Sequence, residues 1–221
     1  MKLRIGFLLL ISFSLLIGCS TNAASNTEQN DEEEQAKSEQ QTEPSSDEDV
    51  VTIEDKTFTG DDLEFYTKMN ELKLVVQIGS AEDDDTVAYL EEQRNYYENI
   101  NVNLHSMIEL YAMSLLAEEK NYFVPDEKLL KAVEDFNNNI EEVDEAVELI
   151  DEYGEQQYNR QIEEYIRQTM LRDRVAQELE EELIEENPEA IEEEINYLLE
   201  DKYDDLLMDQ MSTLEMDIHL Q

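Results

Sequence analysis

The only cysteine in this sequence lies where a signal peptide would end. Cys19 follows an apolar stretch at residues 5–17, and two cations, Lys2 and Arg4, precede that stretch. The stretch is shorter than the ~20 residues that a membrane-spanning helix needs, but it has the length of the apolar part of a secretory signal peptide. A lone thiol has no disulfide partner within the chain, so the position of Cys19 points to another kind of chemistry, namely attachment.

The four residues that end at this cysteine resemble a bacterial lipoprotein signal. Leu16-Ile17-Gly18-Cys19 is similar to the lipobox pattern Leu-x-Gly/Ala-Cys. The resemblance implies that residues 1–18 are a cleaved signal peptide and that Cys19 carries diacylglycerol as the lipid-attachment site. More than one acyl chain is needed for stable anchoring, and this modification supplies at least two. The expected location is therefore the extracytoplasmic face of the cell membrane. An ordinary secretory signal with an incidental cysteine is the alternative.

The two histidines offer little for metal chemistry. His105 and Glu109 are four residues apart, which would place them on one face of a helix as a possible metal pair. Two ligands are too few for a defined site, and the chain contains no His-Glu-x-x-His motif. We expect His105 to be a packed or surface histidine, and His219 carries less information still.

The acidic residues are abundant but are not arranged as a recognisable catalytic or calcium site. Among 58 aspartates and glutamates, close pairs arise by chance. The runs at residues 83–85 and 180–182 lack the spaced loop and central glycine of an EF-hand. With five glycines, the chain has no phosphate-binding loop and no Gly-x-Ser-x-Gly motif. We therefore predict no enzyme, no nucleotide, no metal and no cofactor; a hydrolase or isomerase with an unrecognised site is the enzymatic alternative.

Net charge restricts the partners further. The formal charge is −43, and removal of the leader with its two cations would change it to −45. Such a chain repels nucleic acid, because phosphate contacts need clustered lysine and arginine. Acidic partners should be disfavoured and basic ones favoured. A salt-rich or alkaline habitat would explain the acidity equally well.

Methionine and tyrosine are the residue types best suited to a surface that accepts varied partners. Methionine is flexible, and tyrosine joins an apolar ring to a hydroxyl group. The chain has eight methionines and eleven tyrosines but no tryptophan. Those at helical spacing are more often part of a core, but two adjacent tyrosines cannot both face one core. The candidate contacts for an unfolded polypeptide are Tyr96, Tyr97, Met107, Tyr111 and Met170.

Three segments are expected along the chain. Residues 1–18 form the signal peptide, and residues 19–49 form an acidic linker that begins with the lipidated cysteine. This linker has almost nothing to bury and should be disordered and extended. Residues 50–221 form the folded part, which is large enough for one modest core without disulfides. It should begin with a small hairpin or extended arm at residues 50–59, and the tail at residues 214–218 could be a strand beside it.

Between the N-terminal hairpin and the tail, the sequence shows mainly helical periodicity. Thr59 and Asp62 are typical of a capping box at the start of the first helix, whereas Gly154 and Asn187-Pro188 are typical of helix ends. The fold class is therefore mostly α, a multi-helix domain with a small N-terminal β element and a long C-terminal helix. Helices are expected at about residues 61–78, 86–99, 102–122, 143–153, 158–185 and 189–213, with a further one beginning at Pro125.

This layout resembles the extracytoplasmic chaperones SurA and PrsA. Residues 53–63, IEDKTFTGDDL, are similar to the family's Val-Asn-Gly-x-x-Ile-Thr hairpin and helix start. Residues 107–127, MIELYAMSLLAEEKNYFVPDE, are similar to its helix and turn, and residues 149–154, LIDEYG, to its Leu…Tyr-Gly turn before a long helix. The chain departs from the pattern at Glu54-Asp55, where the family has Asn-Gly, and near Asn121, where the turn glycine is missing.

The resemblance implies a chaperone module without an isomerase. Members such as PrsA carry a parvulin prolyl-isomerase domain before the last helix, whereas only residues 185–188 separate the last two helices here. The implied function is a membrane-anchored chaperone that binds unfolded secreted polypeptides weakly and reversibly, without ATP. The rival hypothesis is a scaffold lipoprotein that docks one fixed partner in an envelope or sporulation complex.

Overall fold

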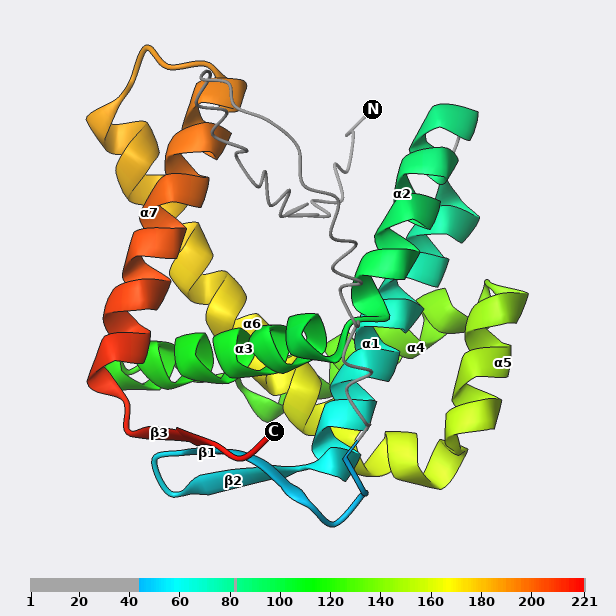
Figure 1. Cartoon of the computed structure of the whole chain (residues 1–221). Coiled ribbons are helices and arrows are strands. Elements are labelled where there is room, and N and C mark those ends of the chain that lie inside the picture. The colour runs from blue at the N-terminus through cyan, green and yellow to red at the C-terminus, as the bar shows by residue number, and fades with distance from the viewer. Residues whose placement is uncertain (1–43, 82, 221) are drawn as a thin grey trace, which may run out of the picture. The chain divides into compact units, whose positions relative to one another are not determined.

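The computed structural model describes residues 44–81 and 83–220, and helices make up most of this part (Figure 1). The described residues form seven helices and three short strands. The predicted fold class, a mostly helical domain with a small N-terminal strand pair and a long C-terminal helix, is confirmed. The predicted signal peptide, Cys19 and the linker up to residue 43 lie outside the described residues.

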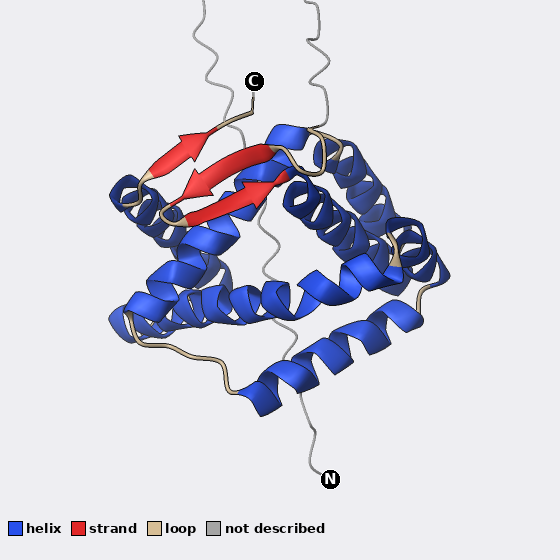
Figure 2. Cartoon of the chain, turned by 90° about the horizontal axis from the view of Figure 1, so that it is seen from below, coloured by secondary structure: helices blue, strands red, loops and turns tan. Residues whose placement is uncertain are grey.

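The strands form one small antiparallel sheet. β1 (Asp49–Ile53) pairs with β2 (Lys56–Thr59) on one side and with β3 (Met216–Ile218) on the other, so the predicted tail strand joins the hairpin (Figure 2). Glu54 occupies the hairpin turn with φ 50°, a conformation that Asn-Gly adopts more easily. The Glu54 N–H donates to the Glu215 carbonyl at 2.8 Å, and the Glu215 N–H donates to the Glu54 carboxylate at 2.8 Å. The tail thus stabilises an unfavourable turn.

The first helix, α1 (Gly60–Ser80), begins at the predicted capping box. The Thr59 N–H donates to the Asp62 carboxylate at 2.8 Å, and the Thr59 hydroxyl donates to the same oxygen at 3.0 Å. Gly60 permits a close approach, because a Cβ there would lie 2.1 Å from the Ser45 carbonyl oxygen. The Gly60 N–H also donates to the Glu48 carbonyl at 2.9 Å. The folded part therefore begins before Val50, and residues 44–49 belong to it rather than to the predicted linker.

The next two helices differ in how far they are buried. α2 (Asp84–Tyr97) packs on α1 and α3, yet none of its 14 described residues is buried. α3 (Ile100–Glu119) packs on α1, α6 and α7 and has nine buried residues. Asn103 of α3 is buried but satisfied, because its side chain donates to the Tyr97 carbonyl at 2.8 Å and accepts from Asn70 at 3.0 Å.

Positive backbone angles mark two of the later turns. Asn121 ends the α3 turn with φ 64°, so asparagine takes the left-handed conformation at the point where the chaperone pattern has glycine. Gly154 has φ 104° between α5 and α6 and faces open space, in line with its predicted role as a helix end. The remaining helices are α4 (Asp126–Glu141), α5 (Asp144–Tyr153), α6 (Glu155–Glu186) and α7 (Glu192–Thr213).

Three apolar clusters hold these elements together. The main core joins the sheet to α1, α3, α4, α5 and the first half of α6. A second cluster lies where α7 packs against α3 and α6. A third, small cluster of Leu183, Ile195 and Leu199 joins the end of α6 to the start of α7. The tip of the α6–α7 hairpin therefore has a separate and much smaller apolar support.

The connected ends of two helical hairpins extend to the same side of α3. One is formed by α1 and α2, the other by α6 and α7, and the sheet lies on the opposite side of α3 (Figure 1). None of the helices in the described part of the chain combines the length and the apolar composition that crossing a membrane requires.

Candidate partner-binding surface

The five side chains predicted to contact an unfolded polypeptide do not form one surface. Met107 is fully buried in the main core, because α3 turns this face toward its neighbours, so its predicted contact role does not fit its position. Tyr111 is half-buried, and its ring packs edge-on against Phe58 of β2 with centroids 5.0 Å apart. Met170 is half-buried against the same core. These three residues mainly contribute to packing.

The two adjacent tyrosines at the end of α2 do reach the surface. Tyr96 is 39% exposed, whereas Tyr97 is half-buried, and their rings meet edge-on with centroids 5.6 Å apart. Burial, together with the neighbouring Tyr96, raises the pKa of Tyr97. Tyr89, two helical turns earlier, is also exposed. Tyr89 and Tyr96 are seven residues apart, so α2 presents tyrosines along one face.

A second group of exposed apolar side chains lies at the tip of the α6–α7 hairpin, where the sequence predicts only a helix break. Ile184 is 51% exposed, Ile191 59% and Tyr197 65%. One signal for this surface was present in the sequence. The run Tyr197-Leu198-Leu199 places three large apolar residues in succession, and a helix cannot turn all three toward one partner.

An open cavity of about 400 Å³ lies at this tip. Its exposed lining is mostly apolar, and its size falls in the range of roughly 300–1,000 Å³ that is usual for ligand pockets. The third apolar cluster supports the helices that form it. The lining residues are Asn187, Ala190, Glu193, Glu194, Tyr197 and Leu198.

The rim of this cavity is strongly acidic. From Glu180 to Asp201 the sequence has eleven acidic residues and no lysine or arginine. Glu194 accepts a hydrogen bond from the Ile191 N–H at 3.3 Å, which caps the start of α7. Among the hydrogen bonds and ion pairs of the described residues, none involves the Glu193 carboxylate. The field at the tip therefore favours a cation, and Glu193 is available to pair with one.

His105 and Glu109, the possible metal pair in the sequence, lie in different surroundings in the structure. Glu109 accepts a hydrogen bond from the Tyr203 hydroxyl at 3.0 Å, which joins α3 to α7. Burial and this carboxylate raise the pKa of Tyr203. His105 is exposed, and in the part of the chain that the structure describes no three potential ligands lie close enough to hold a metal ion. On α7, burial and the neighbouring Asp201 and Asp205 raise the pKa of Asp204.

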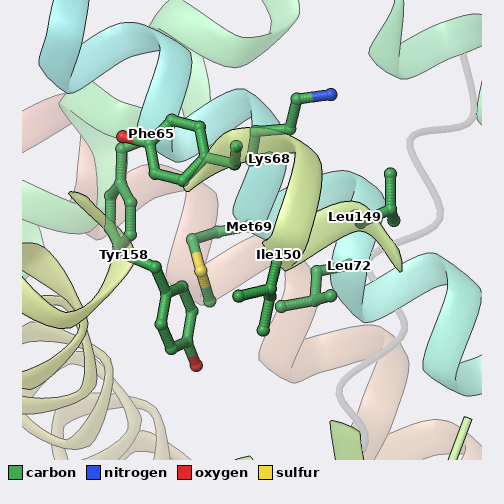
Figure 3. Close-up of a pocket in the computed structure, with 8 residues that line it drawn as sticks. Phe65, Lys68, Met69, Leu72, Leu149, Ile150 and Tyr158 are labelled. Atoms are coloured by element: carbon green, nitrogen blue, oxygen red, sulfur yellow. The ribbon is translucent and has the colours of Figure 1, made fainter. Parts of the chain in front are cut away.

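A second cavity, between α1, α5 and α6, is too small for a ligand. Its volume is about 10 Å³, on the order of the space that one water molecule needs. Figure 3 shows Phe65, Met69, Leu72 and Ile150 closing around it. These side chains belong to the main core or pack against it, so this cavity is a small packing gap.

A polar row on the sheet has the residue types of a catalytic triad but acts as a strand contact. The Thr52 hydroxyl lies 3.0 Å from His219 Nε2 and 3.1 Å from the Thr57 hydroxyl. Asp217 lies 4.0 Å from His219 Nδ1. Neither cavity described above includes any of these residues. These contacts connect β2, β1 and the segment around β3, so they help to hold the tail of the chain on the sheet.

No protein-family model, curated protein or solved structure matches this chain. The resemblance to SurA and PrsA therefore rests on the three sequence patterns alone. The surfaces described above are the basis on which a function can be argued.

Proposed function

We propose that this protein is a membrane-anchored extracytoplasmic chaperone that binds unfolded polypeptides without isomerase activity. The observation that carries the proposal is the presence of large exposed apolar side chains on two hairpins whose connected ends extend to the same side of α3: Tyr89 and Tyr96 on one, Ile191 and Tyr197 on the other. Exposed apolar groups that are gathered within a polar rim mark interaction surfaces.

The arrangement suits weak and reversible binding. Small groups of tyrosine and isoleucine side chains among carboxylates offer limited apolar contacts rather than one large interface, so affinity for any one segment stays modest. Modest affinity allows release without ATP. The negative charge disfavours acidic clients and also keeps the chaperone itself from aggregating.

The decisive experiment is suppression of aggregation by the full chain, reconstituted in neutral phosphatidylcholine vesicles. Three unrelated proteins that aggregate on heating or reduction serve as clients, at low and at high salt. Exposed charges are screened beyond ~8–10 Å near physiological salt, so suppression that persists in high salt reflects contacts rather than repulsion. An acidic disordered protein of similar charge is the control for bulk repulsion.

Each outcome of this experiment is informative. Suppression for all three clients at both salt concentrations supports the chaperone. Absence of suppression, while circular dichroism shows the helical fold, overturns it in favour of a scaffold that docks one fixed partner. Suppression that disappears in salt, and that the control protein reproduces, also overturns it.

The membrane anchor has its own test, the Cys19→Ala variant in bacteria grown with labelled palmitate. The sequence pattern predicts that the wild type incorporates label and is cut before Cys19. The variant should carry no label and should keep its leader. If the variant is processed to the mature size and stays in the membrane fraction, the anchor is not at Cys19.

A further inference from the structure

The cavity at the α6–α7 tip is formed by the turn and the first part of α7. Asn187 and Ala190 line it from the turn, and Tyr197 and Leu198 line it from the helix. The cluster of Leu183, Ile195 and Leu199 lies buried between the two helices. The two helices are thus held together beneath the cavity by packed side chains, and Ala190 and Leu198 of the lining pack against this cluster.

The wide opening of the cavity to solvent determines what kind of molecule can bind there. The cavity is wide open to solvent, so a small molecule bound there would remain largely hydrated. A bulky side chain that belongs to a longer chain fits better, because the rest of that chain can continue along the exposed surface. Ile191, which is 59% exposed beside the cavity, offers a second apolar contact for such a chain.

The charge of the rim selects among such chains. Glu193 lines the cavity and has no ion-pair or hydrogen-bond partner among the described residues, and Glu185, Glu186, Glu189 and Glu192 are exposed around the same turn. The nearest cation in sequence, Lys202, pairs with Glu186 at 3.1 Å and so offsets only one of these charges. An acidic segment would be repelled, whereas lysine or arginine would be attracted.

We infer that the α6–α7 tip binds polypeptide segments in which a bulky apolar side chain is flanked by lysine or arginine. The apolar side chain enters the cavity against Tyr197, and the flanking cations pair with the rim, where Glu193 is the carboxylate of the lining that is free to accept one. This inference rests on the proposed function and deepens it, because it assigns a site and a chemical class to the clients.

The direct test is the affinity of a labelled peptide for the full chain in neutral phosphatidylcholine vesicles, measured by fluorescence anisotropy. The peptide has one phenylalanine flanked by lysines, with glycine and serine elsewhere. Tyr197→Ala should weaken binding about tenfold, the scale expected for removing an aromatic side chain from the centre of a contact. Tyr197→Phe should retain it. Met208→Ala is the matched control: Met208 is 70% exposed on the same helix but lies outside the cavity lining, and its removal should leave affinity unchanged.

The charge selection has its own matched pair. Glu193→Gln should weaken binding about two- to fivefold, the scale of an exposed ion pair. Glu192→Gln removes the neighbouring charge, which is exposed but outside the cavity lining, and should have a smaller effect. A peptide with glutamate in place of lysine, and another with serine in place of phenylalanine, should each bind at least about tenfold more weakly.

The outcomes separate the site from the function. If Tyr197→Ala binds as the wild type does, or if it loses no more affinity than Met208→Ala, the site is wrong. Should the wild type still suppress aggregation in that case, the proposed chaperone stands and its contacts lie elsewhere. If the peptide requires Tyr197 but the wild type suppresses no aggregation, the site is supported and the general chaperone is overturned.

Discussion

The main core and the α6–α7 tip use the same kinds of side chain in opposite ways. In the core, Phe65, Tyr66 and Tyr165 meet with ring centroids 5.5–6.1 Å apart, and none of the three is more than 6% exposed. At the tip, Ile191 and Tyr197 are mostly exposed. Aromatic and aliphatic residues of the core stabilise the fold, whereas those of the tip are left available for a partner.

Polar groups in the core and at the tip also differ, in whether they have a hydrogen-bond partner within the protein. In the core, the Tyr66 hydroxyl donates to the buried side chain of Gln168 at 2.6 Å, so a buried donor is satisfied inside the protein. At the tip, the Glu193 carboxylate has no such partner among the residues that the structure describes. The difference teaches that burial and pairing, rather than residue type, separate the stabilising part of this molecule from the part that is open to binding.

The largest expected effect on the free energy of unfolding is for a residue of the main core. Phe65→Ala should lower the free energy of unfolding by about 3–5 kcal/mol, because a 1% exposed ring leaves a cavity among packed aromatic residues. Tyr197→Ala should change it by less than about 0.5 kcal/mol, as usual for exposed positions. Urea unfolding of the full-length variants, followed by circular dichroism, measures both. Equal losses for the two variants would contradict the comparison.

An intermediate effect is expected for the small cluster beneath the tip. Leu183 is 2% exposed but belongs to a group of only three buried residues, so Leu183→Ala should cost about 2–3 kcal/mol, the low end for a buried leucine. Hydrogen exchange should quicken at the end of α6 and the start of α7 and change little in α1. Faster exchange throughout the helices would mean that the tip and the core unfold as one cooperative unit. The tip would then not be a separately stabilised region.

The smallest effect is electrostatic. Burial and the neighbouring Asp201 and Asp205 raise the pKa of Asp204, so its ionised form is less favourable in the folded state than in the unfolded one. Asp204→Asn should therefore raise Tm at pH 7, by about 1 °C. The gain should fade as the pH falls through the folded-state pKa and vanish below the ordinary value of about 3.9, because the wild type is then protonated in both states.

Calorimetry across this pH range at low salt tests the sign of the electrostatic effect. Asp209→Asn, an exposed position on the same helix, is the control. A gain for Asp204→Asn that grew as the pH fell would contradict the assigned direction. A gain that survives unchanged in high salt would show that the neighbouring carboxylates are not its source.

Much of the secondary structure could be predicted because its signals are local. Thr59 and Asp62 form the expected capping box, and Gly154 separates two helices as expected. The tail strand was also expected beside the hairpin, and it pairs with β1. Helix boundaries were less accurate: α6 begins at Glu155 rather than residue 158, and α7 at Glu192 rather than residue 189.

The candidate site could not be predicted in the same way. Met107 and Tyr96 both lie on helices and both suit a binding surface by residue type, yet one is fully buried and the other is exposed. The tip residues Ile191 and Tyr197 were not predicted as contacts at all. Nothing in the spacing of these residues specifies which neighbouring helix covers them.

The sequence by itself determined the helices, their caps and the acidic character of the chain, because these depend on residues a few positions apart and on composition. Only the tertiary structure decided which apolar side chains are covered. Exposure depends on contacts between segments distant in sequence, such as α3 against α6 or β1 against β3, and helical periodicity does not encode those pairings.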